Sequence, residues 1–213
     1  PWNFNKEIYD YSIQLKTGIN SEEIKSRRDY RDVLTFTIDP KDAKDFDDAI
    51  SFKTLSQDLF EVGIHIADVS HYVKPGSILD KEAYQRATSI YLVDRVVPML
   101  PEKLSNQICS LRPNEEKLTF SAVFEITSAG EVKSEWYGKT VISSDARFTY
   151  EEAQYMISSK SKTVPSKISL TSTEYIVNDD VFQSIQYLQN IASIRRKKRL
   201  KNGAINFNKL EVR

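Results

Sequence analysis

Apolar and polar residues alternate along several stretches of this chain, a pattern typical of β-strands that bury one face. The alternation is clear over residues 59–69 and again over residues 118–126. After the second stretch, Ser128-Ala129-Gly130 provides a turn, and a further extended segment occupies residues 132–142. Two extended segments joined by so short a turn predict an antiparallel hairpin.

Other stretches carry apolar residues at helical spacing, every three or four positions. Thr149 and Glu152 stand at the positions of a capping box, which begins a helix. Asn178 can cap a longer helix, whose last turns are basic and which Gly203 suits as an end. Helices are therefore expected over residues 79–88, 104–111, 149–158 and 178–201.

Three segments give weaker signals. Residues 9–15 alternate, which indicates a covering strand or a lead-in segment within residues 1–27. Residues 159–173 are rich in Ser, Lys and Thr, and they predict a surface loop that is the segment most prone to disorder. Ile205 and Phe207 are expected to begin a strand. Together these elements predict an α+β fold, a mainly antiparallel sheet with helices packed on it.

Composition places the chain among ordinary globular proteins. Of 213 residues, 28% are charged and 40% apolar, and 30 basic side chains balance 30 acidic ones, so net charge indicates no particular partner. Cys109 is the only cysteine, which excludes an intrachain disulfide and is consistent with a reducing cytoplasm. No apolar run approaches the ~18 residues of a membrane span, so no membrane contact is expected. The chain opens with Pro1 and has no signal segment, so we expect an internal piece of a longer protein.

The most concentrated chemistry is an acidic loop between two apolar runs. Five aspartates fall within ten residues, at positions 39, 42, 45, 47 and 48. Strand, loop and strand is the expected structure, with Asp39 at the end of the first strand because it precedes Pro40. Packed carboxylates repel one another, so a fold that gathers them needs an offsetting charge, most simply a bound cation. Hard oxygen ligands in this number favour Mg²⁺ or Mn²⁺.

A solvated acidic loop is the alternative, with Lys41 and Lys44 balancing part of its charge. A calcium-binding EF-hand loop is excluded, because no Gly stands at the sixth position from any of these aspartates and no Glu at the twelfth from Asp39. The aspartate cluster alone does not decide between a metal site and a solvated loop.

The motif TIDPKDAKDFDDAISF, residues 37–52, resembles the signature of the ribonuclease II family catalytic domain. Residues 62–126 continue the resemblance, and the tail RRKKRLKNGAINFNKLE continues it weakly. The similarity is dense over residues 28–126 and is greatest to bacterial ribonuclease R. It implies that residues 28–213 are the N-terminal part of such a domain, truncated on its C-terminal side, with residues 1–27 as a lead-in segment.

The resemblance implies a metal-dependent hydrolytic exoribonuclease that digests RNA from the 3′ end and releases nucleoside 5′-monophosphates. Asp39 and Asp48 would then bind Mg²⁺ directly, with Mn²⁺ as the other candidate, and Asp45 would act directly or through water. Asp47 would orient the attacking water or hold a second ion. Asp45 and Asp47 are thus the implied catalytic residues, whereas Asp42 falls outside the family pattern.

The expected RNA-contacting residues are Tyr91, Arg95 and Arg112. Tyr91 matches a family tyrosine that packs against a base near the RNA 3′ end, and a buried packing role is the alternative. Nothing in the sequence distinguishes the two arginines from arginines in surface ion pairs. The basic run at 195–201 either complements the helix dipole or contacts phosphate. The implied partners are the 3′ end of single-stranded RNA and the RNA-binding domains of the parent chain.

Two further residues follow the predicted strand at 59–69. We expect Asp68 to be a turn residue and His71 a surface residue, rather than neighbours of a metal, because the histidines lack a partner at zinc-ligand spacing. Cys109 is expected to be an inert buried residue.

Two other functions are consistent with parts of the sequence. One is an RNA-binding module that does not cleave, against which the four matching aspartates argue. The other is a metal-using phosphatase or glycosyl transferase, against which the match over residues 62–126 argues. A truncated domain exposes apolar surface, so we also expect aggregation or a partner.

Overall fold

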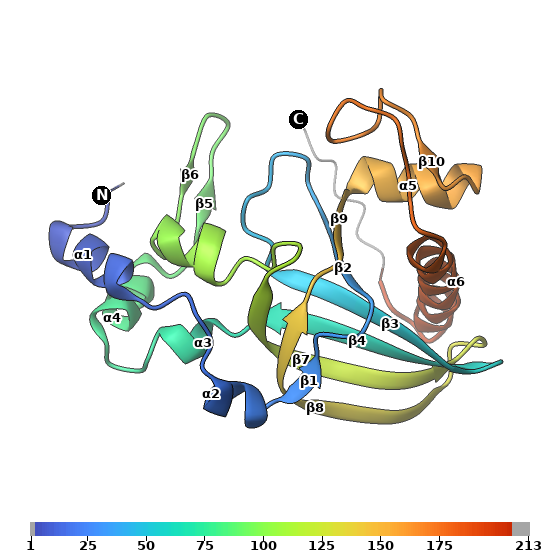
Figure 1. Ribbon diagram of the computed structural model, residues 1–213, viewed down its shortest axis with the longest axis horizontal. Helices are drawn as coiled ribbons and strands as arrows, with labels where there is room; N and C mark the ends of the chain where they lie inside the picture. The colour runs from blue at the N-terminus through green and yellow to red at the C-terminus, as the bar shows by residue number, and fades with distance from the viewer. Residues whose placement is uncertain (1–2, 206–213) are drawn as a thin grey trace.

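The computed structural model describes residues 3–205, which form a seven-stranded sheet with helices packed on it (Figure 1). The strands lie in the order β1-β8-β7-β4-β3-β2-β9. Their bounds are Arg28–Tyr30 (β1), Thr35–Asp39 (β2), Asp48–Ser56 (β3), Leu59–Ala67 (β4), Glu116–Thr127 (β7), Val132–Ser143 (β8) and Ala146–Thr149 (β9). Two short hairpins form separate sheets, Ile90–Tyr91 (β5) with Val96–Val97 (β6), and Thr163–Val164 (β10) with Tyr175–Ile176 (β11).

Six α-helices and one π-helical turn lie among the described residues. The helices are Lys6–Gln14 (α1), Ser21–Lys25 (α2), Val69–Tyr72 (α3), Ile78–Arg86 (α4), Tyr150–Ser159 (α5) and Asp179–Lys201 (α6), and the π-helical turn is Leu104–Ile108. None of the helices in this part of the chain is both long and apolar enough to cross a lipid bilayer.

Strands β2, β3, β4, β7 and β8 pair antiparallel in succession, and the predicted hairpin at 118–142 is confirmed as β7 and β8. Both edges are parallel, because β1 pairs with β8 and β2 pairs with β9. The sheet is therefore mixed but mainly antiparallel, and the predicted α+β class is confirmed.

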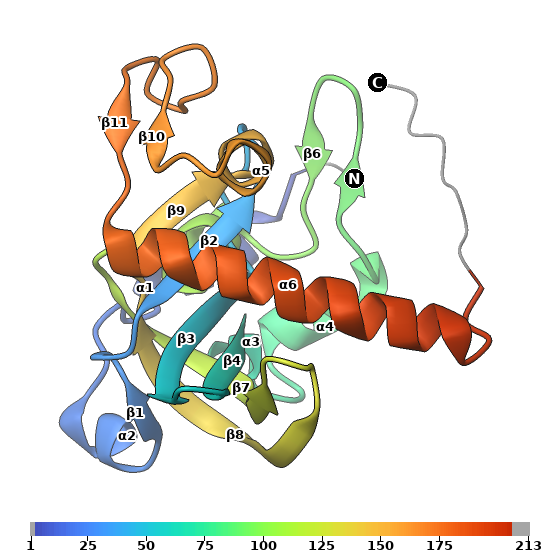
Figure 2. The same cartoon turned by 90° about the vertical axis from the view of Figure 1, so that its right-hand side faces the viewer.

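Two sets of helices pack against the two faces of the sheet. On one face, Ala49 and Ala67 pack with Ile8 of α1, Leu79 of α4 and Leu104 of the π-helical turn. On the other, α5 and α6 cover apolar residues of β2, β3, β4 and β9, and α6 runs across the strands (Figure 2). The sheet is thus held between two hydrophobic cores, which fixes the ends of β2 and β3 where the aspartate loop begins and ends.

Helices α5 and α6 begin where the sequence predicts. Asn178 caps α6, with its side chain accepting a hydrogen bond from the backbone N–H of Asp180. Thr149 and Glu152 form the expected capping box at α5, with each side chain bonded to the backbone of the other residue. Local hydrogen bonding therefore determines both helix starts.

The weaker predictions are corrected in part. Residues 9–14 lie in α1 rather than in a strand, and Leu15 is the C-cap of this helix. Asn5 caps its start, and its buried residues, Ile8 and Ser12, are one turn apart. The segment 159–173 contains strand β10 and buries Val164 and Ser169, so it is an ordered part of the fold. The helix expected at 104–111 is a π-helical turn. Ile205 is not in a strand, and Phe207 lies outside the described residues.

Candidate active site at the aspartate loop

The aspartates lie where two strands of the sheet end and begin. Asp39 is the last residue of β2 and Asp48 is the first of β3, as the sequence predicts. The connecting residues 40–47 contain a turn and no regular strand, and the loop extends beyond the sheet (Figure 1). This agrees with the expectation that the segment around Asp45 is irregular.

The carboxylates of this loop influence one another's charge. Burial raises the pKa of Asp39, and the nearby carboxylates of Asp48 and Asp45 add to the rise, whereas the Thr37 side chain and Arg147 oppose it. Partial burial raises the pKa of Asp47, and repulsion from the carboxylates of Asp45, Asp48 and Asp39 raises it further. Part of the surface of Asp47 nevertheless remains accessible to solvent. The four aspartates of the motif are therefore close enough to repel one another.

Three buried side-chain atoms in the described chain make no hydrogen bond, and all three lie beside this loop. They are Thr37 Oγ1, Asp39 Oδ2 and Arg147 Nε. An unpaired buried carboxylate oxygen beside other carboxylates suits a hard cation, so the donor set fits Mg²⁺ or Mn²⁺. Within residues 3–205, no group of three or more His, Cys, Asp or Glu side chains is already arranged to hold a metal ion. A shared ion therefore requires side-chain movement from the positions seen here.

Tyr91 lies next to the loop, on the exposed hairpin formed by β5 and β6. Its hydroxyl donates a hydrogen bond of 3.0 Å to Asp45 Oδ2, and the residue is 67% exposed. Tyr91, Asp45 and Arg95 help to line a hollow of about 370 Å³. Tyr91 is thus not a buried packing residue, and its ring is free to stack on a flat ligand.

The two arginines proposed for phosphate contact differ in position. Arg95 borders the hollow beside Tyr91 and hydrogen-bonds Asp94. Arg112 lies 3.9 Å from Glu115, and both residues are exposed. The structure therefore brings Arg95, but not Arg112, to the same hollow as Asp45, and phosphate contact by either stays a prediction.

Arg147 on β9, which no sequence pattern indicates, contacts the loop from the neighbouring strand. Its Nη2 lies 3.0 Å from the carbonyl oxygen of Pro40, 3.1 Å from that of Lys41 and 3.4 Å from that of Ala43. Its guanidinium carbon is 4.6 Å from the centre of the Phe46 ring. An arginine about 100 residues further along the chain gives no local signal of such contacts, so only the parallel pairing of β9 with β2 reveals it.

The far end of the loop is held by residues that follow the π-helical turn. Ser110 Oγ donates to the carbonyl oxygen of Lys44 at 2.9 Å and accepts from the backbone N–H of Phe46 at 3.0 Å. The N–H of Leu111 donates to the carbonyl oxygen of Phe46 at 2.9 Å. Phe46 is buried, so this end of the loop is attached to the hydrophobic core.

The expectation for Asp68 is wrong. Asp68 is buried and forms an ion pair of 2.7 Å with the buried Arg27. Burial alone raises the pKa of Asp68, but hydrogen bonds from Ser70 and Arg27 lower it on balance. His71 is half-buried, with its Nδ1 3.5 Å from Glu23. Asp68 therefore joins β4 to the segment before β1 and is not a simple turn residue.

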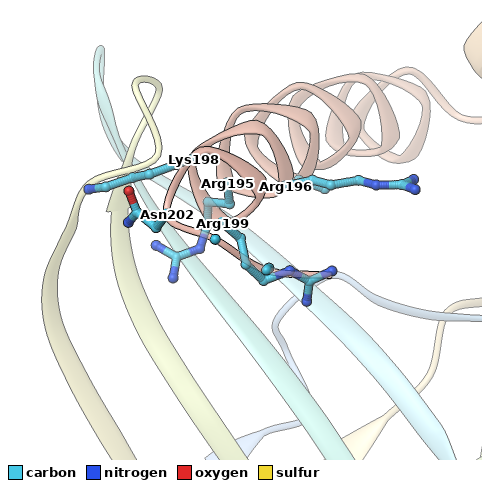
Figure 3. A pocket seen from close by; sticks show the side chains of 8 residues that line it. Arg195, Arg196, Lys198, Arg199 and Asn202 are labelled. Carbon is cyan, nitrogen blue, oxygen red and sulfur yellow. The ribbon is translucent and has the colours of Figure 1, made fainter. Parts of the chain in front are cut away.

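The basic run lies at the C-terminal end of α6, around a hollow of about 890 Å³ (Figure 3). Within the described chain, no carboxylate forms an ion pair with Arg195–Lys201. Arg195 donates to the carbonyl oxygen of Gly130 at 3.1 Å, and the labelled side chains point in several directions rather than toward one point. Both the helix dipole and phosphate contact remain as roles for these cations.

Comparison with known proteins gives a consistent family. Residues 27–213 match the RNB domain family. DIS3-like exonuclease 2 of the fission yeast Schizosaccharomyces pombe is 48% identical over 92% of this chain and 21% of its own length. Ribonuclease R 1 of Lactococcus lactis is 42% identical over 99% of this chain and 24% of its own length. The chain thus spans about a fifth to a quarter of these relatives.

The fold agrees with a solved relative. Mycoplasma genitalium RNase R, in complex with ribose-methylated single-stranded RNA, superimposes with a TM-score of 0.83 and 31% identity, over 96% of this chain and 30% of that one. Both bacterial and eukaryotic relatives match, so the resemblance holds for the family rather than for bacterial ribonuclease R alone. Because the family match covers most of its residues, this chain belongs to the RNB domain family.

Proposed function

We propose that the protein containing this chain is a metal-dependent exoribonuclease, which hydrolyses RNA from the 3′ end and releases nucleoside 5′-monophosphates. The observation that carries the proposal is the aspartate loop, where four motif carboxylates interact and Asp39 presents a buried unpaired oxygen. Relatives named as ribonuclease R and as DIS3-like exonuclease support the same activity.

Within this proposal, Asp39 and Asp48 hold Mg²⁺ or Mn²⁺, and Asp45 assists directly or through water. When bound, such a cation supplies positive charge that offsets the charge developing on the scissile phosphate and makes a nearby water easier to deprotonate. Asp47 retains solvent access, so its carboxylate is suited to accept a hydrogen bond from the attacking water and orient it.

Tyr91 supplies a stacking surface for a base near the 3′ end. Its exposed ring has a π-face that accepts any base, a contact worth ~1–3 kcal/mol. The hydrogen bond from its hydroxyl to Asp45 links that surface to the acidic loop. Arg95, beside the same hollow, is placed to meet a phosphate, and Arg112 remains a second candidate.

The proposed substrate is the 3′ end of single-stranded RNA, with RNA-binding domains of the longer protein as partners. The cytoplasm is the proposed location, because a single cysteine, which can form no intrachain disulfide, is consistent with a reducing compartment. Burial raises the pKa of the Cys109 thiol to about 12, so it stays protonated and inert at neutral pH.

The proposal is tested with Asp47→Asn in the longer protein. Loss of the carboxylate that orients water is expected to lower cleavage roughly 100-fold or more with little change in RNA binding. Asp42→Asn is the matched control, because Asp42 belongs to the same loop but not to the family pattern. Product analysis on an RNA labelled at its 5′ end measures the direction and rate of cleavage.

Undiminished cleavage by Asp47→Asn would contradict the assignment. Retention of intact RNA on a filter by the unmodified protein with Mg²⁺ would instead indicate the alternative function, an RNA-binding module that does not cleave.

A further inference from the structure

We propose that Arg147 is a positioning residue that holds loop residues 40–46 in the shape in which the neighbouring aspartates can share a cation. The inference rests on the metal site of the proposed function and adds a residue outside the aspartate motif. Arg147 contacts none of the reacting atoms in this proposal, and it acts through the backbone of the loop.

The side chain of Arg147 reaches several backbone carbonyl groups of the loop. Nη2 of Arg147 meets the carbonyl oxygens of Pro40, Lys41 and Ala43, the residues directly after Asp39. The N–H of Ala43 also bonds the carbonyl oxygen of Pro40 at 3.1 Å, which makes this stretch a turn. Arg147 therefore fixes the turn that leads away from Asp39.

Arg147 also contacts Phe46, at the other end of the loop. The guanidinium lies over the ring of Phe46, which is buried and stands between Asp45 and Asp47. A cation over an aromatic face is attracted by the negative charge of the ring face. One side chain thus connects the start of the loop to the residue between two of the catalytic candidates.

The position of Arg147 on β9 places its side chain near Asp39. In the parallel pairing of β2 and β9, Arg147 is opposite Thr37, and Thr149 is opposite Asp39. Residues two apart on a strand point to the same face, so Arg147 lies on the face that carries Thr37 and Asp39. Its positive charge therefore lies on the side of the strands that carries the Asp39 carboxylate.

Arginine suits this role better than lysine. A planar guanidinium can bond several carbonyls and stack on a ring at the same time, whereas an ammonium group supplies the charge without the planar face. The buried Nε of Arg147 has no acceptor in the described chain, so the side chain is held by its outer nitrogen and its face. Arg147→Lys is therefore expected to preserve only part of the effect.

The test is Mn²⁺ titration followed by electron paramagnetic resonance, on the 213-residue chain and on the longer protein. Arg147→Met is expected to weaken Mn²⁺ binding about 10–100-fold, the usual effect of removing a residue that orients metal ligands. Arg147→Lys is expected to give an intermediate value. In the longer protein, kcat on RNA is expected to fall while KM changes little, because Arg147 makes no RNA contact in this proposal.

Arg86→Met is the matched control. Arg86 also lies over a phenylalanine, 3.9 Å from the centre of the Phe4 ring, and donates to the carbonyl oxygens of Pro98 and Asn3. Removing it disrupts these contacts and an ion pair with Glu82, none of which involves the aspartate loop. Mn²⁺ affinity is expected to be unchanged in Arg86→Met, whereas a purely structural effect of arginine loss would weaken both variants alike.

The outcomes separate this inference from the proposed function. Asp39→Asn is expected to abolish saturable Mn²⁺ binding, and an absence of such binding in the unmodified chain and in the longer protein would overturn both proposals. Normal binding by the unmodified protein and by both Arg147 variants would overturn only the role of Arg147. Should Arg147→Met fail to fold, Arg147→Lys carries the comparison, since it retains the charge and most of the volume.

Discussion

Single residues in the interior of the sheet form a polar chain that no local pattern announces. The His65 ring is fully buried, and its two nitrogens lie 2.6 Å from Ser121 Oγ and 2.8 Å from Ser51 Oγ. Thr140 continues the chain on β8. Burial lowers the pKa of His65 to about 4, so the ring is neutral in the folded protein at neutral pH. Strands β3, β4, β7 and β8 therefore each contribute at least one hydroxyl or imidazole group to a shared network.

This network predicts a pH dependence of stability. The unfolded chain has an ordinary histidine pKa of 6.5, whereas the folded pKa is about 4, so the unfolded state binds more protons between these values. The contribution of His65 to the free energy of unfolding is therefore fully present above pH 6.5, and it is lost as the pH falls toward 4. The loss amounts to about 3 kcal/mol at the acid end of this window.

The variant His65→Gln isolates that contribution. Glutamine keeps hydrogen-bonding capacity but does not titrate. Between pH 7 and pH 4.5, the free energy of unfolding of the variant is therefore expected to fall by about 2–3 kcal/mol less than that of the unmodified protein. Urea unfolding at several pH values measures both slopes. Parallel slopes for the two proteins would show that His65 does not titrate on unfolding.

At the residue scale, the sequence predicts chemistry that is local and misses chemistry that is long-range. The aspartate motif is contiguous, so its position at the ends of β2 and β3 follows from the apolar runs around it. Arg147 and the Arg27–Asp68 pair depend on strands brought together by the fold. No sequence pattern indicates the ion pair of Asp68, because its partner Arg27 stands 41 positions away.

Elements are predictable where local signals and burial agree. Strands β4 and β7 alternate strictly and are found where expected, and α6 begins at its predicted cap. Residues 9–15 mislead because their alternating aromatic side chains are largely exposed in α1, where Tyr9 is 57% exposed. An alternating pattern predicts a strand only if the fold buries one of its faces, and that condition is not visible in the sequence.

Helix α5 shows how a predicted capping box acquires a second role. Glu152 is buried, and its Oε2 accepts the N–H of Thr149 at 2.8 Å. Its Oε1 accepts the N–H of Leu170 at 2.8 Å and the hydroxyl of Tyr175 at 3.0 Å. The carboxylate therefore attaches the segment before α6 to the start of α5, which explains why the expected disordered loop is ordered.

Glu152→Gln tests this attachment. The amide offers one acceptor oxygen where the carboxylate offers two, so one buried donor loses its partner, and the free energy of unfolding is expected to fall by about 1–3 kcal/mol. Glu151→Gln, on the exposed side of the same helix turn, is expected to change it by less than about 0.5 kcal/mol. Chemical denaturation measures both. Limited proteolysis within residues 165–174 is expected to accelerate only in Glu152→Gln, and equal rates would contradict the attachment.

At the scale of the whole molecule, one face of the sheet is divided into two parts. Near the end of β3, Phe52 and Phe60 pack beneath Tyr187 of α6. Toward the aspartate loop, the apolar residues of the same face are exposed; they are Ile64, Ile66, Phe120 and Tyr137. Asp48 is paired with Ile66, so the exposed apolar surface begins directly beside a proposed metal ligand.

This surface predicts self-association of the isolated 213-residue chain. Apolar side chains gathered on adjacent strands are a favourable contact for a second copy, because each copy removes the other's apolar area from water. Phe120→Glu interrupts the surface while placing its carboxylate opposite Lys139, a cross-strand pair that favours folding. The variant is therefore expected to remain monomeric at concentrations where the unmodified chain associates. Sedimentation velocity over a range of concentrations measures this difference.

Ile176→Glu is the control, because Ile176 is 68% exposed on the separate β10–β11 hairpin and not on the open face. It is expected to leave association unchanged. A chain that stays monomeric without any substitution, or equal effects of the two variants, would show that this face is not the associating surface. If only Phe120→Glu abolishes association, the apolar face beside Asp48 is a true contact surface, and it adjoins the aspartate loop.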